Sequence, residues 1–247
     1  VAADGAAAAG CAARWDVSKV TAALPPVSLI RRYDTHRLIA SRYSEPDSVL
    51  GMIADDEAQL ADVFDLDHAT NDRLLAENQR FAGIGVHELV FGVPYYRTVN
   101  AAFTHAHPFG SRFNGPERGA WYAAFELRTA QAEVAFHKSV QLAEIGRFEE
   151  EVTFDDYQAD VSAPLHDLRD APAFSQCLAP DSYVASQLLA ERLLAAGSMG
   201  VIYPSVRRRG GTCLSVFRPA LVVHLRKAQT WRFRWQGKPA PVIDPVP

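Results

Sequence analysis

Apolar and polar residues alternate over much of this chain, with the period of two that is typical of half-buried β-strands. Stretches with this pattern are residues 28–43, 87–93, 95–104, 148–154, 161–168, 199–203, 212–217 and 220–225. The short aromatic stretch Trp121-Tyr-Ala-Ala124 is predicted as a further strand, in which Tyr122 faces away from Trp121 and Ala123. The pattern therefore predicts strands distributed along most of the chain.

Other stretches have the composition, spacing and end signals of helices. These are residues 14–24, which stop at Pro25-Pro26, and residues 55–64, 71–81, 129–145 and 182–196. Gly146 and Gly197 follow the last two and are typical helix ends. Since strands and helices mix without strict alternation, we predict an α+β fold. One compact domain is expected at 27–230, after an N-terminal tail and short helix (1–26) and before an irregular, proline-rich tail (231–247).

Composition narrows the class of protein. The chain has 247 residues, of which 48% are hydrophobic and 22% charged, as in ordinary soluble domains. A formal net charge of −4 gives no electrostatic reason to expect binding to nucleic acid or to an anionic membrane. No apolar run reaches the length of a membrane span. The three cysteines, Cys11, Cys177 and Cys213, are too scattered for a disulfide framework, which favours the cytoplasm.

The densest group of chemically capable residues lies between positions 110 and 133. A glycine-flanked turn carries Arg112 and Asn114, the short strand carries Tyr122, and the following helix carries Glu133. A guanidinium offers a rigid fork of donors that matches phosphate oxygens. A cation, an aromatic ring and a carboxylate on neighbouring elements suit a ligand with phosphates, a flat base and a ribose. NAD fits that description.

These motifs resemble the RES domain family, which is named after an arginine, a glutamate and a serine. The resemblance extends from about residue 29 to residue 223. It is carried by His36-Arg-Leu-Ile-Ala-Ser-Arg-Tyr43, Gly110-Ser-Arg-Phe-Asn114, Trp121-Tyr-Ala-Ala124, Thr129-Ala-Gln-Ala-Glu133, Tyr183-Val-Ala-Ser-Gln187, Gly200-Val-Ile-Tyr-Pro-Ser-Val-Arg207 and Gly210-Gly-Thr-Cys-Leu214. It implies a mixed β core like that of ADP-ribosyltransferases, flanked by helices.

The resemblance also implies an activity: the toxin of a bacterial toxin–antitoxin pair, acting on NAD as substrate with no resident cofactor. Arg37 and Arg112 would bind the diphosphate, and Tyr122 would pack on the nicotinamide, with Asn114 beside them. Glu133 would stabilise the positive charge that develops on the ribose as nicotinamide leaves. Attack by inorganic phosphate would then give ADP-ribose 1″-phosphate and deplete NAD.

Two assignments stay open at this point. Arg97 competes with Arg37 for the role of the family's first arginine, because Tyr96-Arg97 is an aromatic–arginine pair that also precedes the motifs at residues 110–133. Ser205, at the end of a predicted strand, competes with Ser186, near the start of a predicted helix, for the family's serine. A helix N-terminus favours anions, so Ser186 is also a candidate for holding phosphate.

Alternative functions share these residues. A protein side chain could accept the ADP-ribose, which would make the chain a mono-ADP-ribosyltransferase of a host protein. A non-catalytic binding protein with the same fold is the third hypothesis. The resemblance implies a cognate antitoxin with a DNA-binding domain as partner, and cytoplasmic action without direct contact to nucleic acid or membrane.

Two other kinds of site are disfavoured. His105, His107 and His137 lack neighbouring cysteines or a carboxylate cluster, so no metal site is expected. Gly83-Ile-Gly85 lacks the third glycine and the preceding strand of a dinucleotide-binding fingerprint.

Overall fold

The computed structural model describes residues 23–44 and 83–247. Seven strands form one sheet in the order β1-β2-β5-β4-β3-β6-β7, and β1 also pairs with β3. Their bounds are β1 Val27–Ala40, β2 Trp121–Ala124, β3 Glu149–Asp167, β4 Gly200–Pro204, β5 Thr212–Val216, β6 Val223–Gln236 and β7 Val242–Pro245. The pairing of β3 with β4 is parallel and the others are antiparallel, so the sheet is mixed.

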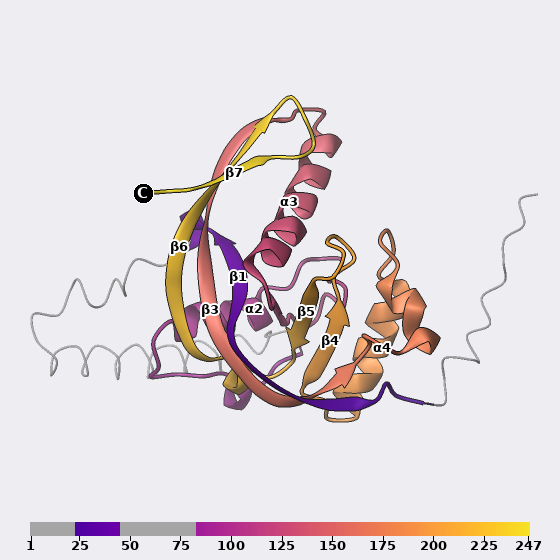
Figure 1. The fold of residues 1–247 in the computed structure, drawn as a ribbon. Helices are drawn as coiled ribbons and strands as arrows, with labels where there is room; N and C mark the ends of the chain where they lie inside the picture. Colours follow the sequence, from indigo (N-terminus) through magenta and orange to yellow (C-terminus); the bar gives the residue numbers. More distant parts are fainter. Residues whose placement is uncertain (1–22, 45–82) are drawn as a thin grey trace, which may run out of the picture.

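β3 is the strand around which the sheet is built. Its 19 residues pair with β6 over the first part, with β1 along most of its length, and with β4 at its end. Figure 1 shows β3 and β6 as long curved strands that bend around α3 (Leu127–Glu144). The expected strands at 148–154 and 161–168 are therefore two parts of a single strand.

Alternating side chains of the sheet face two separate cores. Tyr122 and Ala124 of β2 contact the first core, which also contains Ala130 and Leu142 of α3 and residues of α4 (Val184–Ala195). Trp121 and Ala123 contact the second core, which α2 (Tyr96–Thr104) covers with Val99 and Phe103. The prediction that Tyr122 faces away from its two neighbours is confirmed, and so is the α+β class.

The helix ends follow the signals in the sequence. Gly146 and Gly197 have φ of +67° and +75°, the left-handed conformation that stops a helix.

Short 3-10 turns connect the elements: η2 Ser41–Tyr43, η4 Val86–Glu88, η5 Pro172–Leu178 and η6 Pro219–Leu221. No helix in the described ranges is both long and apolar enough to cross a membrane. The helices expected at 55–64 and 71–81, and nearly all of that at 14–24, lie outside the described residues.

Two predictions of local structure are wrong. Residues 95–104 were predicted as a strand but form α2, in which Tyr96, Val99 and Phe103 are buried at helical spacing. Residues 87–93 form a 3-10 turn and irregular chain instead of a strand.

The expected irregular tail at 231–247 is also wrong. Its first six residues continue β6, and β7 follows. Phe233 and Trp235 are almost fully buried against β3 and α3, because every second residue of this part of β6 points into the first core.

Candidate functional site

Arg37, in the second half of β1, is fixed by its surroundings but has no anionic partner among the residues that the structure describes. Its Nη1 donates a hydrogen bond to the carbonyl oxygen of Tyr122 at 3.1 Å, and its guanidinium lies 4.7 Å from the ring centre of Trp121. Its Nε is shielded from solvent and has no partner. Burial lowers the pKa of Arg37 to about 10, so the side chain still carries its charge at neutral pH. Within the described residues, no carboxylate pairs with this partly buried cation.

Tyr122 connects β2 to the glycine-flanked turn. Its hydroxyl accepts a hydrogen bond from the backbone N–H of Phe113 and donates one to Oδ1 of Asn114, both at 2.8 Å. Gly110 allows this turn, since its φ is +68° and a Cβ there would lie 2.2 Å from the carbonyl oxygen of Asn114. Desolvation raises the pKa of the Tyr122 hydroxyl well above its ordinary value. The hydroxyl is therefore a neutral, fixed group at neutral pH.

Arg112 points inward from the same turn. Its Nη1 donates to the carbonyl oxygens of Cys177 and Ala179, at 3.1 and 2.8 Å, and its guanidinium lies 4.8 Å from the ring centre of Tyr183. Only 6% of Arg112 is exposed. These contacts attach the η5 segment to the turn, so the side chain has an evident structural role beside the one expected from the sequence.

Glu133 and Ser205 lie together although 72 positions separate them in the sequence. The Ser205 hydroxyl donates to Oε1 of Glu133 at 2.6 Å, and the thiol of Cys213 lies 3.6 Å from the same oxygen. Ser205 Oγ in turn accepts hydrogen bonds from the backbone N–H groups of Arg207 and Arg208, at 3.1 and 3.0 Å. These bonds fix the hydroxyl so that its proton is directed at the carboxylate.

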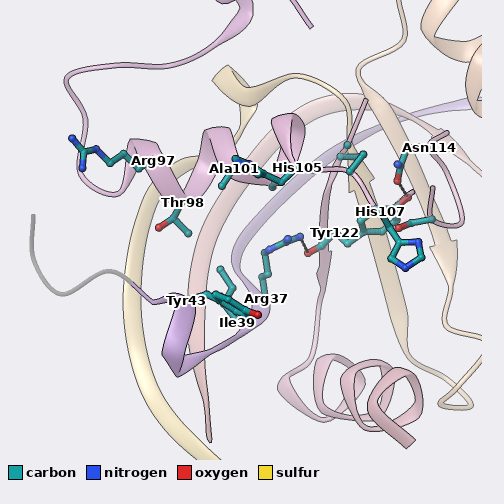
Figure 2. A pocket seen from close by; sticks show the side chains of 15 residues that line it. Arg37, Ile39, Tyr43, Arg97, Thr98, Ala101, His105, His107, Asn114 and Tyr122 are labelled. Atoms are coloured by element: carbon teal, nitrogen blue, oxygen red, sulfur yellow. Dashed lines mark hydrogen bonds between the residues drawn. The ribbon is translucent and has the colours of Figure 1, made fainter. Parts of the chain in front are cut away.

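The two residues that competed in the sequence for these roles are placed differently. Ser186 is fully buried in the first turn of α4, and its hydroxyl donates to the carbonyl oxygen of Tyr183 at 3.0 Å. Arg97 lies at the start of α2, and Figure 2 shows its guanidinium pointing away from Arg37. The structure therefore brings Ser205, not Ser186, next to Glu133.

A cavity of about 350 Å³ lies beside Arg37, between α2 and the ends of β1 and β2. Four of the residues predicted to act on NAD line it: Arg37, Arg97, Asn114 and Tyr122. Glu133, Ser205, Arg112 and Ser186 do not. The site residues thus lie in two groups: those that line the cavity, and the hydrogen-bonded Glu133–Ser205 pair.

Tyr122 and Tyr203 connect the two groups. Tyr122 lines the cavity, and its ring contacts the first core. Burial raises the pKa of Tyr203 well above its usual value, and Cys213, Tyr122 and Glu133 add smaller effects in the same direction. Tyr203 pairs with Cys213, whose thiol contacts Glu133, and its ring contacts that of Phe113, whose N–H donates to Tyr122. β1 and β2 are paired only at His36 and Ala124, so the sheet opens beside Arg37.

Apart from Arg97, sequence reasoning missed the residues that α2 and the position directly after it contribute to the cavity. Thr98, Ala101 and His105 line the cavity, and they are three and four positions apart, as one face of a helix requires. That spacing was visible in the sequence, but the alternating pattern of the same stretch favoured a strand. Cys213 was also missed as a neighbour of Glu133, because only the pairing of β4 with β5 brings it there.

Comparison with known proteins places the chain in a family. A family model described as the RES domain matches residues 88–236, more than half of the chain. Arg37 lies outside the matched residues, and the other predicted site residues lie within them. None of the curated proteins gives a significant match. One similar solved structure is a crystal structure of the M. tuberculosis MbcT-MbcA toxin-antitoxin complex, with 20% identity and a TM-score of 0.39 over 53% of this chain and 73% of that chain.

Proposed function

Because this chain belongs to the RES domain family, we propose that it is the toxin of a toxin–antitoxin pair and consumes NAD. In the proposed reaction the bond between nicotinamide and ribose breaks, and inorganic phosphate forms a bond to the same ribose carbon. Nicotinamide leaves with the electron pair of the broken bond, and the second product is ADP-ribose 1″-phosphate.

The hydrogen bond between Ser205 and Glu133 is the observation that carries the proposal. It joins two residues of the family motif that the sequence separates widely, on α3 and just after β4. A carboxylate that is oriented before substrate binds can stabilise a developing positive charge without reorganising during the reaction. Glu133 is half-buried, so the interaction with such a charge is screened by water less than it is at an exposed position.

The other residues are assigned to binding. Arg37 supplies a positive charge for the diphosphate and has no counterion among the described residues. Tyr122 and Asn114 form a rigid wall between Arg37 and the Glu133–Ser205 pair. Arg112 holds the turn that carries Asn114, and it remains a candidate for phosphate binding through donors that the two carbonyls do not use. A cognate antitoxin with a DNA-binding domain is the proposed partner, and the cytoplasm the proposed place of action.

The test is mass analysis of the products after purified protein is incubated with NAD and phosphate. We expect nicotinamide and ADP-ribose 1″-phosphate, and a loss of about 100-fold or more in the rate for Glu133→Gln. Glu144→Gln, an exposed change at the end of the same helix, is the matched control and should be as active as the unmodified protein.

Other outcomes would contradict parts of the proposal. ADP-ribose attached to a lysate protein, without the free phosphate ester, would make this a mono-ADP-ribosyltransferase. No nicotinamide release with either acceptor would leave a binding protein. Full activity of Glu133→Gln would remove Glu133 from the reaction while leaving the reaction itself in place.

A further inference from the structure

The cavity contains the positive charge of Arg37, which no carboxylate among the described residues neutralises. Arg37 donates one hydrogen bond to a backbone carbonyl and stacks on Trp121, while its Nε has no partner. A shielded cation without an anionic partner is unfavourable, because burial removes its hydration. A bound anion would provide the missing partner. Arginine suits phosphate groups in particular, since its donors match two phosphate oxygens at once.

The rest of the lining suits a larger molecule than a free anion. None of the described residues that line it is acidic, so no carboxylate among them opposes an anion. Ile39, Ala101, Ala102 and Ala120 provide apolar surface, and Thr98 provides a neutral polar group. The ring of Tyr43 also lines the cavity, and it lies 4.6 Å from the guanidinium of Arg42. The volume of about 350 Å³ lies in the range of small-molecule sites.

We propose that this cavity binds the ADP half of the dinucleotide, a placement that rests on the proposed function, and that α2 forms the wall of the nucleotide site. The diphosphate lies against Arg37, and the adenosine lies along the apolar face that Ile39 and Ala101 provide. Tyr122 separates this half from the Glu133–Ser205 pair, where the nicotinamide ribose is held. The nucleotide site thus includes a helix that the sequence motifs do not include.

β1 carries a second arginine with nearly the same contacts, which serves as an internal control. Arg32 donates to the carbonyl oxygen of Phe125 at 3.0 Å and lies 4.9 Å from that ring's centre, whereas Arg37 makes the corresponding contacts with Tyr122 and Trp121. Arg32 is exposed and does not line the cavity. Of these two arginines, only Arg37 is therefore expected to contribute to nucleotide binding.

Calorimetric titration of the full chain with ADP tests the placement without any turnover. We expect Arg37→Gln to weaken ADP binding at least tenfold, and Arg32→Gln to change it less than about twofold. Ala101→Trp fills the cavity from an exposed helix position, so it should weaken ADP binding at least tenfold in a folded protein. Ala143→Trp, at an exposed alanine near the end of α3, is its control.

Two results would overturn the inference. One is unchanged ADP affinity in both Arg37→Gln and Ala101→Trp, which would locate the nucleotide elsewhere. The other is pyrophosphate binding as tight as that of ADP, which would mean that the apolar wall contacts no nucleoside. Nicotinamide release is measured separately on the unmodified protein. ADP binding in this cavity without any nicotinamide release would contradict the reaction and not the location of the ADP site.

Discussion

Arg37 and Arg112 show two uses of the same side chain in this protein. Arg112 is almost fully buried, and one of its nitrogens is shared between two backbone carbonyls that it holds in place. Arg37 makes a single hydrogen bond to the backbone and faces a cavity. Loss of Arg112 should therefore affect folding as well as binding, whereas Arg37 can be tested for binding more directly.

The two serines lead to a prediction at the scale of single residues. Ser205→Ala removes the hydrogen bond that orients Glu133 and should lower the rate of nicotinamide release about tenfold or more. Ser186→Ala removes only a bond to the Tyr183 carbonyl within α4 and should leave the rate within about twofold. Steady-state rates at saturating NAD measure both. Equal losses in the two variants would show that the Ser205–Glu133 bond has no specific role.

The residue types of the site could be predicted from the sequence, but their grouping could not. Glu133, Tyr122 and Asn114 lie on consecutive elements, so short-range motifs were enough to propose them. The choice of Ser205 over Ser186 depends on where β4 ends relative to α3, which no local pattern specifies. Whether Arg112 faces a ligand or the protein depends likewise on the position of η5, which starts 60 residues later.

At the scale of elements, α2 was misassigned because two periodicities overlap in its sequence. Apolar and polar residues alternate roughly between positions 95 and 104, but Tyr96, Val99 and Phe103 also lie on one helical face. Tyr95 precedes the helix with φ of +59° and ψ of 23°, so the chain turns sharply there. Packing of Val99 and Phe103 against the second core favours the helix, and this tertiary contact could not be read from the local pattern.

Gly119 determines how closely α2 approaches the sheet. Its N–H donates to the Phe103 carbonyl at 2.9 Å, and a Cβ there would lie 2.1 Å from the carbonyl oxygen of Ala102. Gly119→Ala should therefore lower the free energy of unfolding by about 2 kcal/mol and weaken ADP binding, because α2 must move away. Urea denaturation and ADP titration measure these effects.

Gly115 offers the matched control for this change. A Cβ at Gly115 would meet nothing within 4 Å, so Gly115→Ala should alter the free energy of unfolding by less than about 0.5 kcal/mol. If Gly119→Ala were equally harmless, the close contact between α2 and the start of β2 would not limit the position of the helix.

Glu88 connects η4 to two distant segments and provides a prediction about pH. Arg118 donates two hydrogen bonds to its carboxylate, at 2.9 and 2.8 Å, and Arg218 forms an ion pair with it. Mainly because of the bonds from Arg118, the pKa of Glu88 falls from 4.5 to about 2. Its stabilising effect is therefore complete above pH 4.5 and is lost as the pH falls towards 2.

Glu88→Gln should lower the free energy of unfolding at pH 7 by about 3 kcal/mol, because Arg118 is left buried without a counterion. The difference from the unmodified protein should shrink as the pH is lowered from 4.5 towards 2. Urea denaturation at several pH values measures it. A difference that stays constant over this range would mean that ionised Glu88 is not responsible for the stabilisation.

At the scale of the whole molecule, β3 joins parts of the sheet that are distant in sequence. It pairs with β1, which precedes the motifs at residues 110–133, and with β4 and β6, which follow them. The tail was predicted as irregular because of its prolines, although Trp231, Phe233 and Trp235 alternate as a strand does. Long-range pairing with the first part of β3 makes this segment a strand, and a sequence pattern alone does not show which partner is present.

The cavity is bounded by α2 on one side and by β1 and β2 on the other, so a ligand there contacts segments that are far apart in the chain. A ligand that binds only the folded state raises the free energy of unfolding, by about 2.7 kcal/mol at 100 times its Kd. ADP at that concentration should therefore raise the midpoint of thermal unfolding by several degrees. At the same ADP concentration, a tenfold loss of affinity in Arg37→Gln lowers this stabilisation to about 1.4 kcal/mol, so the thermal shift should be about half as large or less. A thermal shift of equal size in both proteins would mean that ADP stabilises the fold from another site.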